Sequence, residues 1–261
     1  MNKNILLLLV LMVAVAIAWS KPASGKSAAN TFKDLRDGQV YKTVKIGKQT
    51  WMAQNLNYGK AMRGKAELKA GQKYCYNDNV EKCKRYGGLY TWDVAMQSCP
   101  KGWHLPSAEE WNEFEKNVRD VCENFEALEG KCKASSIGAA LKDSRFCNLQ
   151  DVRADEDWER QFICEVITNL APNSGIEDGK LWEGTDDVGF TALPAGWGER
   201  RVGLDSTYGE FHEFGQHGDW WSSTEVGEYG AWRRGLSAKH GEFNTYDIDK
   251  GNYLSVRCLK D

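Results

Sequence analysis

The spacing of apolar and polar residues is most regular between residues 90 and 111, where it predicts a helix, a short strand and a second helix. Trp92, Ala95 and Cys99 stand at i, i+3 and i+7, so one face of a short helix carries all three. The proline and glycine that follow end this helix, because proline cannot continue it and glycine suits a turn. Cys99 therefore lies on a predicted helix and needs a partner elsewhere in the chain.

A longer helix is predicted to begin at Ser107, after a short buried strand at residues 103–105. Ser107 and Glu110 form a capping box, in which a hydroxyl and a carboxylate satisfy the N–H groups at the start of the helix. Apolar residues then recur at intervals of three and four, which is typical of a helix with one buried face. These apolar residues are Trp111, Phe114, Val118 and Val121.

Strands are predicted towards both ends of the chain. Residues 40–46 and 49–53 fit two short strands joined by a Gly-Lys turn, and residues 74–76 fit another. From residue 181 onward, short apolar runs bounded by Gly, Asp and Asn are typical of short strands and long loops. Residues 155–170 carry apolar side chains every four positions and predict a further helix. We therefore expect an α+β fold with short antiparallel strands and two main helices, in which the first and last strands can pair.

The beginning of the chain has the pattern of a secretory signal peptide over residues 1–20. One lysine precedes an apolar run from residue 5 to 18, and small residues follow. This run is shorter than the about 20 apolar residues that span a bilayer. We expect a secreted, cell-surface or periplasmic protein without a transmembrane segment in its mature form. An uncleaved membrane anchor is the alternative.

The rest of the chain is expected to form a single domain. Residues 21–33 are rich in Pro, Ser, Ala and Gly, and are expected to form a flexible lead-in. No later stretch has a similar composition, so residues 34–261 can share one core or two closely merged ones. Residues 122–170, approximately, depart from the compact pattern of the rest. We interpret them as a helical elaboration that contains cysteines.

The charge of the chain bears on its partners. The formal net charge is −3, and it becomes one unit more negative when the signal peptide removes Lys3. A nucleic-acid partner requires a basic face, so this mildly acidic balance argues against one.

The eight cysteines all follow the predicted signal peptide, and an even number in an exported chain favours disulfides. No Cys-x-x-Cys pair occurs, so zinc ribbons and thioredoxin-type redox motifs are not supported. Two pairs of cysteines each enclose a short loop, which favours a local bridge in each. Cys164 lies on the helix predicted at residues 155–170, and Cys147 is its nearest unassigned partner. The expected bridges are Cys75–Cys83, Cys122–Cys132 and Cys147–Cys164.

Six blocks of this sequence, taken in order, resemble the Fibrobacter major paralogous domain family, a set of secreted domains. The blocks are DGQVYKTVKIGKQTWMAQNLNY, YGGLYTWDVAM, CPKGWHLPSAEEW, GFTALPAGW, WWSSTE and YLSVRC. Together they cover nearly all of the mature chain.

A second resemblance concerns the fold. Trp-x-x-Ala-x-x-x-Cys followed by Gly and His-Leu is similar to the first helix of C-type-lectin-like domains, a superfold that includes the sulfatase-modifying, formylglycine-generating type of domain. The resemblance implies a disulfide-stapled C-type-lectin-like fold in which Cys99 bridges to Cys258 on the last strand. Closing a loop of about 160 residues in this way would contribute on the order of 5 kcal/mol.

Two departures limit what these resemblances imply. Sugar-binding C-type lectins hold calcium and sugar with Glu-Pro-Asn or Gln-Pro-Asp and Trp-Asn-Asp triplets, and none of these occurs here. Sulfatase-modifying enzymes use a reactive cysteine pair late in the domain, whereas Cys258 is the only cysteine here after Cys164. A fold does not by itself confer either chemistry. We therefore expect no calcium-dependent lectin mechanism and no oxidase chemistry.

The late aromatic residues suggest a carbohydrate-binding surface, because the apolar faces of sugars pack on aromatic rings while polar side chains hold the hydroxyls. Large aromatic residues also dominate protein cores, and burial is the favoured interpretation of Trp92, Trp103, Trp111 and Trp221. The candidate binding residues are Trp182, Trp197, Trp232, Tyr229, Asp186 and Asp187. Further polar residues close to these aromatic residues in sequence are Asp219, Glu225 and Arg233.

Possible metal ligands are weaker candidates, and we expect neither a bound metal nor a cofactor. His212 and His217 are flanked by glycines and are not spaced as i, i+4, which favours a surface loop. Asp247, Asp249 and Asn252 could offer oxygen atoms to calcium but lack the frame of an EF-hand. We expect His104 to be a hydrogen-bonded core residue.

Catalytic motifs are also weak. No Gly-x-Ser-x-Gly elbow surrounds the hydroxyls at residues 222–224. The carboxylates Asp186 and Asp187 could serve a glycoside hydrolase only at separations that a sequence cannot show. The favoured hypothesis is a secreted, non-catalytic module that binds carbohydrate or a cell-envelope component. The alternatives are a structural or adhesion protein without glycan affinity, and then a sulfatase-modifying-type oxygenase or a glycoside hydrolase. The oligomeric state stays open.

Overall fold

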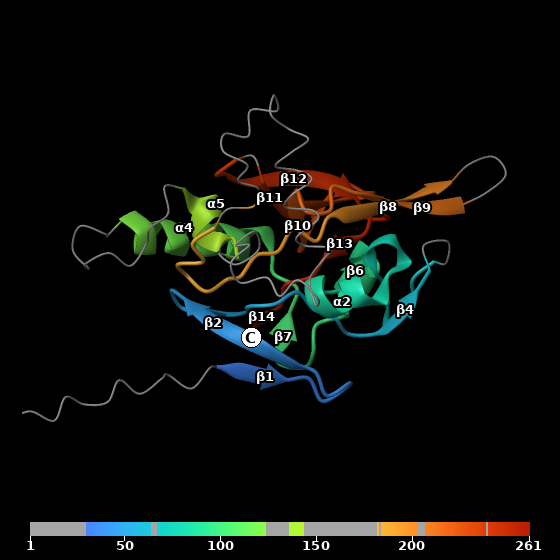
Figure 1. Cartoon of the computed structure of the whole chain (residues 1–261), viewed down its shortest axis with the longest axis horizontal. Coiled ribbons are helices and arrows are strands. Elements are labelled where there is room, and N and C mark those ends of the chain that lie inside the picture. The colour runs from blue at the N-terminus through green and yellow to red at the C-terminus, as the bar shows by residue number, and fades with distance from the viewer. Residues whose placement is uncertain are drawn as a thin grey trace, which may run out of the picture.

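A computed structural model describes residues 30–63, 67–123, 136–143, 182, 184–202, 207–238 and 240–261. Two sheets contain most of the described strands, and short helices pack beside and between them. Figure 1 shows the first strands of the chain (blue) at the bottom of the view and the strands within residues 217–249 (orange to red) at the top. The observed fold is mixed α+β and consists mostly of sheet, which confirms the expected class.

The first sheet joins the beginning of the domain to its last strand. Its five strands have the order β1-β2-β3-β14-β7. They are β1 (Thr31–Lys33), β2 (Val40–Ile46), β3 (Gln49–Met52), β14 (Leu259–Lys260) and β7 (Trp103–His104). Leu259 lies opposite Trp51 of β3 on one side and opposite His104 of β7 on the other, antiparallel to both. The last strand therefore connects two segments that are far from it in sequence.

The second sheet has seven strands in the order β12-β11-β10-β13-β6-β5-β4. They are β12 (Phe243–Asp249), β11 (Gly230–Ser237), β10 (His217–Val226), β13 (Leu254–Ser255), β6 (Leu89–Tyr90), β5 (Gln72–Tyr74) and β4 (Lys60–Met62). β10, β11 and β12 form an antiparallel meander, and β13 runs parallel to β10. A separate hairpin of β8 (Trp197–Val202) and β9 (Thr207–His212) precedes β10.

The main helix is α4 (Ala108–Glu123), and it begins as the sequence predicts. The backbone N–H of Glu110 donates to the Ser107 hydroxyl at 3.2 Å, and the N–H of Ser107 donates to the Glu110 carboxylate at 2.8 Å. Trp111, Phe114 and Val118 are fully buried, but Val121 is 43% exposed, so the predicted apolar stripe ends one turn early. The other described helical elements are η1 (Tyr76–Asp78), α2 (Val80–Tyr86), α3 (Trp92–Ala95) and α5 (Ile137–Leu141).

Buried tryptophans tie the residues around α3 to β10. The Trp92 indole N–H donates to the Ser222 carbonyl at 2.8 Å, and the Trp221 indole N–H donates to the Tyr90 carbonyl at 2.7 Å. Trp103 and Trp111 are also buried, so burial is confirmed for all four tryptophans assigned to the core. A buried indole needs an acceptor for its N–H, and backbone carbonyls supply it here.

Arg257 is a charged residue at the centre of the packing, with no exposed surface. Its guanidinium donates to the Asn55 side chain at 2.8 Å and to the Phe190 carbonyl at 2.6 Å, and it lies 4.2 Å from the centre of the Phe190 ring. Burial lowers the pKa of Arg257 to about 9, and the nearby Asp186 carboxylate opposes that change. The guanidinium therefore links backbone segments that are distant in sequence.

Two disulfides have both cysteines among the described residues, Cys75–Cys83 and Cys99–Cys258. The first matches the local bridge expected from spacing, and the second matches the bridge implied by the resemblance to C-type-lectin-like domains. Cys122 is also disulfide-bonded. Its partner, and the expected Cys147–Cys164 bridge, lie outside the described residues, as do the signal peptide at residues 1–20 and the helix predicted at residues 155–170.

Several local predictions were wrong. The helix expected to carry Cys99 is α3, which ends at Ala95, so Cys99 follows the helix. Residues 31–33, assigned to the flexible lead-in, form β1 and pair with β2. The strand expected at residues 74–76 is β5 and ends at Tyr74, because η1 begins at Tyr76. Part of the loop expected between Cys75 and Cys83 is the start of α2, whose N-cap Asn79 accepts a hydrogen bond from the N–H of Glu81 at 2.9 Å.

Candidate functional site

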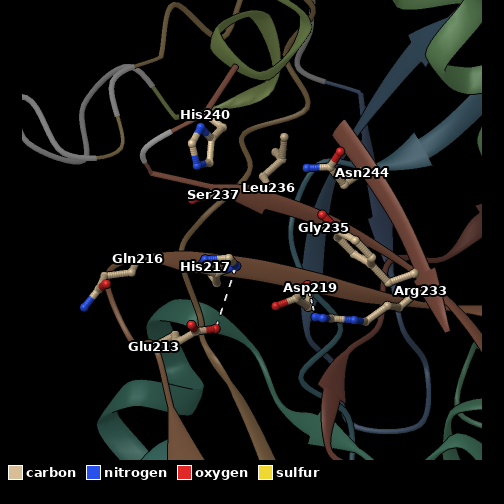
Figure 2. Close-up of a pocket in the computed structure, with 11 residues that line it drawn as sticks. Glu213, Gln216, His217, Asp219, Arg233, Gly235, Leu236, Ser237, His240 and Asn244 are labelled. Carbon is tan, nitrogen blue, oxygen red and sulfur yellow. Dashed lines mark hydrogen bonds and ion pairs between the residues drawn. The ribbon is translucent and has the colours of Figure 1, made fainter. Parts of the chain in front are cut away.

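A polar pocket of about 250 Å³ lies on one face of the β10–β11–β12 meander, and we call it the sheet-face pocket. Side chains two apart on a strand share a face, and the strand register brings such side chains into rows. Asp219 lies opposite Gly235, which lies opposite Asn244, and Arg233 lies opposite Tyr246. Tyr246 also lines the pocket, and Figure 2 labels the other four residues together with His217, Ser237 and His240.

The buried floor of this pocket is the Asp219–Arg233 pair. Asp219 is only 1% exposed, and Arg233 donates to its Oδ1 at 2.5 Å. The second carboxylate oxygen, Oδ2, is buried without a hydrogen-bond partner among the described residues. Burial raises the pKa of Asp219 to about 6, although its electrostatic interactions with Arg233 and His217 oppose this. A buried acceptor of this kind favours a ligand that can donate a hydrogen bond.

Gly235 allows the Asp219 carboxylate to pack against the middle strand. A Cβ atom at this position would lie 2.7 Å from Asp219 Oδ1. Any side chain at position 235 would therefore displace the carboxylate from its present place beside Arg233.

Glu213 forms one wall of the pocket and connects it to the β8–β9 hairpin. Its backbone has a positive φ of 58° in the turn that leads into β10. Its Oε2 atom accepts a hydrogen bond from the Trp197 indole N–H at 2.9 Å and lies 3.8 Å from Nδ1 of His217. Figure 2 shows Glu213 and His217 facing each other at the edge of the pocket. Trp197, which is partly exposed, therefore lies next to the pocket.

The residues on one face of the β8–β9 hairpin form a second polar cluster. Trp197 lies opposite His212 and Glu199 lies opposite Glu210. Nε2 of His212 is 3.2 Å from Glu199 Oε1, and the rings of Trp197 and His212 are 4.6 Å apart. Among the described residues, Glu199, Glu210 and His212 form the group of His, Cys, Asp and Glu side chains that could hold a metal ion.

Trp182, one of the predicted binding residues, does not form a binding surface. It is 1% exposed, and its indole N–H donates to the Ala192 carbonyl at 2.8 Å. The prediction was wrong because this indole belongs to the buried core that contains Trp111 and Trp220, and does not face solvent.

Asp186 and Asp187 shape the loop before Phe190 and lie outside the sheet-face pocket, so their predicted role in binding stays a prediction. Asp186 accepts hydrogen bonds from the backbone N–H and the hydroxyl of Thr191, at 2.6 and 2.9 Å. Asp187 accepts one from the Thr185 hydroxyl at 2.7 Å. Burial raises the pKa of Asp186 to about 6, against the effect of its hydrogen bonds.

The remaining candidates do not share one face. Tyr229 is 70% exposed at the turn between β10 and β11. Trp232 lies on β11 beside Arg233 in sequence, so its side chain points to the opposite face from the pocket. Of the six predicted binding residues, Trp197 alone adjoins the pocket, through Glu213. Asp219 and Arg233, which the sequence placed only near the aromatic residues, form its floor.

The weaker candidates have local roles. His104 is hydrogen-bonded as expected but is not a core residue, because its side chain is 38% exposed between Asp261 and Glu110. Asp249 accepts hydrogen bonds from Gly251 and Asn252 in the turn after β12. His212 belongs to the cluster with Glu199 and Glu210, and His217 is not part of that group.

Sequence reasoning missed Glu213, His240, Asn244 and Tyr246 as pocket residues. The available signal was the alternation of side chains between the two faces of a strand, in HGD (residues 217–219) of β10 and WRRG (residues 232–235) of β11. It identifies residues that share a face, but the pocket depends on the register of three strands and on a turn with positive φ.

These observations define the class of protein: a mixed α+β domain with disulfides and a polar pocket on an open sheet face. The model of the Fibrobacter succinogenes major domain matches residues 44–260, so the chain belongs to that family. No curated protein and no solved structure matches the chain. Within the described part of the chain, every helix is too short or too polar to span a bilayer.

Proposed function

We propose that this domain is a non-catalytic module that binds carbohydrate in the sheet-face pocket, as part of a protein exported from the cell. The observation that carries the proposal is the buried Asp219 carboxylate, which has an oxygen without a partner at the floor of a polar pocket. Sugar hydroxyls are donors and acceptors at once, so they suit a pocket that offers carboxylate, guanidinium, imidazole and amide groups together.

An aromatic ring borders this polar floor. Tyr246 lines the pocket and is 49% exposed, and its ring centre lies 5.3 Å from the guanidinium carbon of Arg233. The apolar face of a sugar ring could pack on Tyr246 while its hydroxyls reach Asp219 and Asn244. The volume of about 250 Å³ lies below the roughly 300–1,000 Å³ of pockets for drug-sized ligands, which favours one sugar unit or the end of a chain.

The finer fold assignment is also part of the proposal: the domain has a C-type-lectin-like arrangement. Three features support it. Trp92 and Ala95 lie on a short helix, Cys99 follows that helix, and Cys99 is bonded to Cys258 immediately before the last strand. The pairing of β14 with β3 also joins the two ends of the domain.

A binding experiment with matched tyrosine variants tests the proposal. The unmodified protein should be retained on insoluble cellulose or on another member of a polysaccharide panel. Tyr246→Ala and Trp197→Ala should weaken retention by about fivefold or more, because loss of an aromatic anchor commonly costs over 1 kcal/mol. Tyr229→Ala removes an exposed tyrosine outside the pocket and should bind like the unmodified protein.

The results separate the proposal from its first alternative. If the folded protein is retained on no polysaccharide of the panel, the carbohydrate hypothesis is wrong, and a structural or adhesion role is favoured. Equal loss in the Tyr246 and Tyr229 variants would show that retention does not use this pocket.

The same pocket supports a glycoside hydrolase as the second candidate. Burial raises the pKa of Asp219 to about 6, and Glu213 supplies another carboxylate in the same pocket. Paired carboxylates with different environments are the usual equipment of such enzymes. However, the direct hydrogen bond from Arg233 favours the ionised form of Asp219 and makes it a poor acid. Release of reducing sugar that Asp219→Asn abolishes would favour the hydrolase.

A sulfatase-modifying-type oxygenase receives no support from the described residues. That chemistry needs a reactive thiol, and each cysteine in the described part of the chain is disulfide-bonded. Thiol counting on the native protein completes this test, because a free and reactive cysteine elsewhere would reopen the oxygenase alternative.

A further inference from the structure

We propose that the β8–β9 hairpin carries a site for a first-row divalent cation, with zinc as the best match, formed by Glu199, Glu210 and His212. We call these three residues the hairpin triad. The inference rests on this hairpin alone and does not depend on carbohydrate binding in the sheet-face pocket.

The strand register brings the triad together on one face. Glu199 of β8 lies directly opposite Glu210 of β9, and His212 is two residues further along β9, so its side chain points to the same side. Nε2 of His212 is 3.2 Å from Glu199 Oε1 and 3.9 Å from Glu210 Oε2. The three ligand atoms all lie within 4.8 Å of one another.

These distances suit a single metal ion. A tetrahedral zinc with bonds of about 2.1 Å holds its ligand atoms about 3.4 Å apart. The two measured separations lie on either side of that value, so small side-chain rotations would place all three atoms around one centre. No change of the backbone pairing is needed, because the ligands come from two adjacent antiparallel strands.

The register also raises an electrostatic problem that a cation would solve. Two carboxylates directly opposite each other on one face of an antiparallel pair repel, and such a pair destabilises a hairpin. A divalent cation that bonds to both carboxylates would offset this repulsion.

Trp197 holds the imidazole in position. Its ring lies 4.6 Å from the ring of His212, and its indole N–H is hydrogen-bonded to Glu213. Trp197 is therefore a positioning residue, because it limits rotation of the His212 side chain without supplying a ligand atom. Ordered ligands lose less freedom on metal binding, which favours affinity.

The ligand types indicate the metal. Imidazole suits zinc and other first-row transition metals, whereas calcium and magnesium prefer sites made wholly of oxygen ligands. Two carboxylates and one imidazole leave at least one coordination position for water or another ligand, as in zinc sites with three protein ligands.

A zinc titration tests the proposal. The untagged full chain is first treated with a chelator, and zinc binding is then followed by calorimetry. We expect one zinc ion per chain, with calcium and magnesium failing to compete at equal concentration. His212→Ala and Glu210→Gln should each lower the affinity for zinc by about 100-fold or more. Replacing a residue that only hydrogen-bonds to a metal ligand already lowers metal affinity by about 10–100-fold. Replacement of zinc by cobalt should give visible absorption that His212→Ala abolishes.

Two control variants make the experiment decisive. His217→Ala removes a histidine that lines the sheet-face pocket, and Glu242→Gln removes a carboxylate from the exposed surface before β12. Both should bind zinc within twofold of the unmodified protein. Absence of zinc binding by the folded, unmodified chain overturns the proposal. Full zinc binding by His212→Ala also overturns it, because zinc would then be bound elsewhere. The same holds if His217→Ala loses as much zinc affinity as His212→Ala.

Discussion

Removal of the Cys99–Cys258 bridge should cost about twice as much stability as removal of the Cys75–Cys83 bridge. The perturbations are two double variants, Cys99→Ala/Cys258→Ala and Cys75→Ala/Cys83→Ala. The bonded cysteines are 159 residues apart in the first pair and 8 apart in the second. A disulfide stabilises a fold mainly by restricting the unfolded chain, and loops of these lengths give about 5 and about 2.5 kcal/mol.

The two bridges are suited to this comparison because the long-loop variant removes no more buried sulfur than the short-loop variant. Cys258, Cys75 and Cys83 are all at most 2% exposed, and Cys99 is partly exposed. The difference of about 2.5 kcal/mol therefore reports loop length more than packing. Since domains are commonly stable by only 5–15 kcal/mol, the long-loop variant should be close to unfolding at 37 °C.

Urea unfolding without reductant, followed by tryptophan fluorescence, measures both losses. Trp51, Trp111 and Trp220 are fully buried and should report the loss of the core directly. Equal losses in the two variants, or a larger loss for the short loop, would refute the reasoning from loop length.

Three further predictions follow from buried or bridging groups. Arg257→Lys should lower the free energy of unfolding by about 2–3 kcal/mol in urea, because lysine cannot reach all the acceptors that the guanidinium satisfies and each orphaned acceptor costs about 1–3 kcal/mol. His104→Gln should destabilise the protein more at pH 5.5 than at pH 8.5. Burial lowers the pKa of His104, but hydrogen bonds to two carboxylates outweigh it and raise the pKa overall. The stability that His104 contributes is therefore complete below about pH 6.5 and is lost as the pH rises above the pKa of His104 in the folded protein. The difference between the two unfolding curves should stay below about 1 kcal/mol, because the side chain is partly exposed, and a larger effect at pH 8.5 would contradict the assignment. Gly235→Ala should cost about 1–3 kcal/mol in thermal or urea unfolding and abolish polysaccharide retention, because its Cβ would displace Asp219; unchanged retention would contradict the proposed floor of the pocket.

Local periodicity was sufficient to predict several elements. The three- and four-residue spacing of Trp111, Phe114 and Val118 predicted α4, and its capping box predicted where the helix begins. The turn between residues 46 and 49 predicted the β2–β3 hairpin. The Cys99–Cys258 bridge was predicted from the resemblance to C-type-lectin-like domains, since spacing alone allows many partners for a cysteine.

Long-range packing decided the features that local patterns did not predict. Trp182 and Trp197 look alike in the sequence, yet the first completes the core and the second lies beside the pocket. The start of α2 was missed because its residues are polar and show no apolar period. The pocket was missed because Asp219, Gly235 and Asn244 meet only through the register of three strands, which no single segment encodes.

The position of β14 has a consequence for biogenesis. Leu259 and Lys260 occupy an internal place in the first sheet, between β3 and β7. During synthesis, β3 and β7 emerge from the ribosome long before the strand that separates them. The sheet therefore cannot be completed on a nascent chain that stops short of residue 260, and the domain should stay open to chaperones and oxidoreductases until its last residues are released.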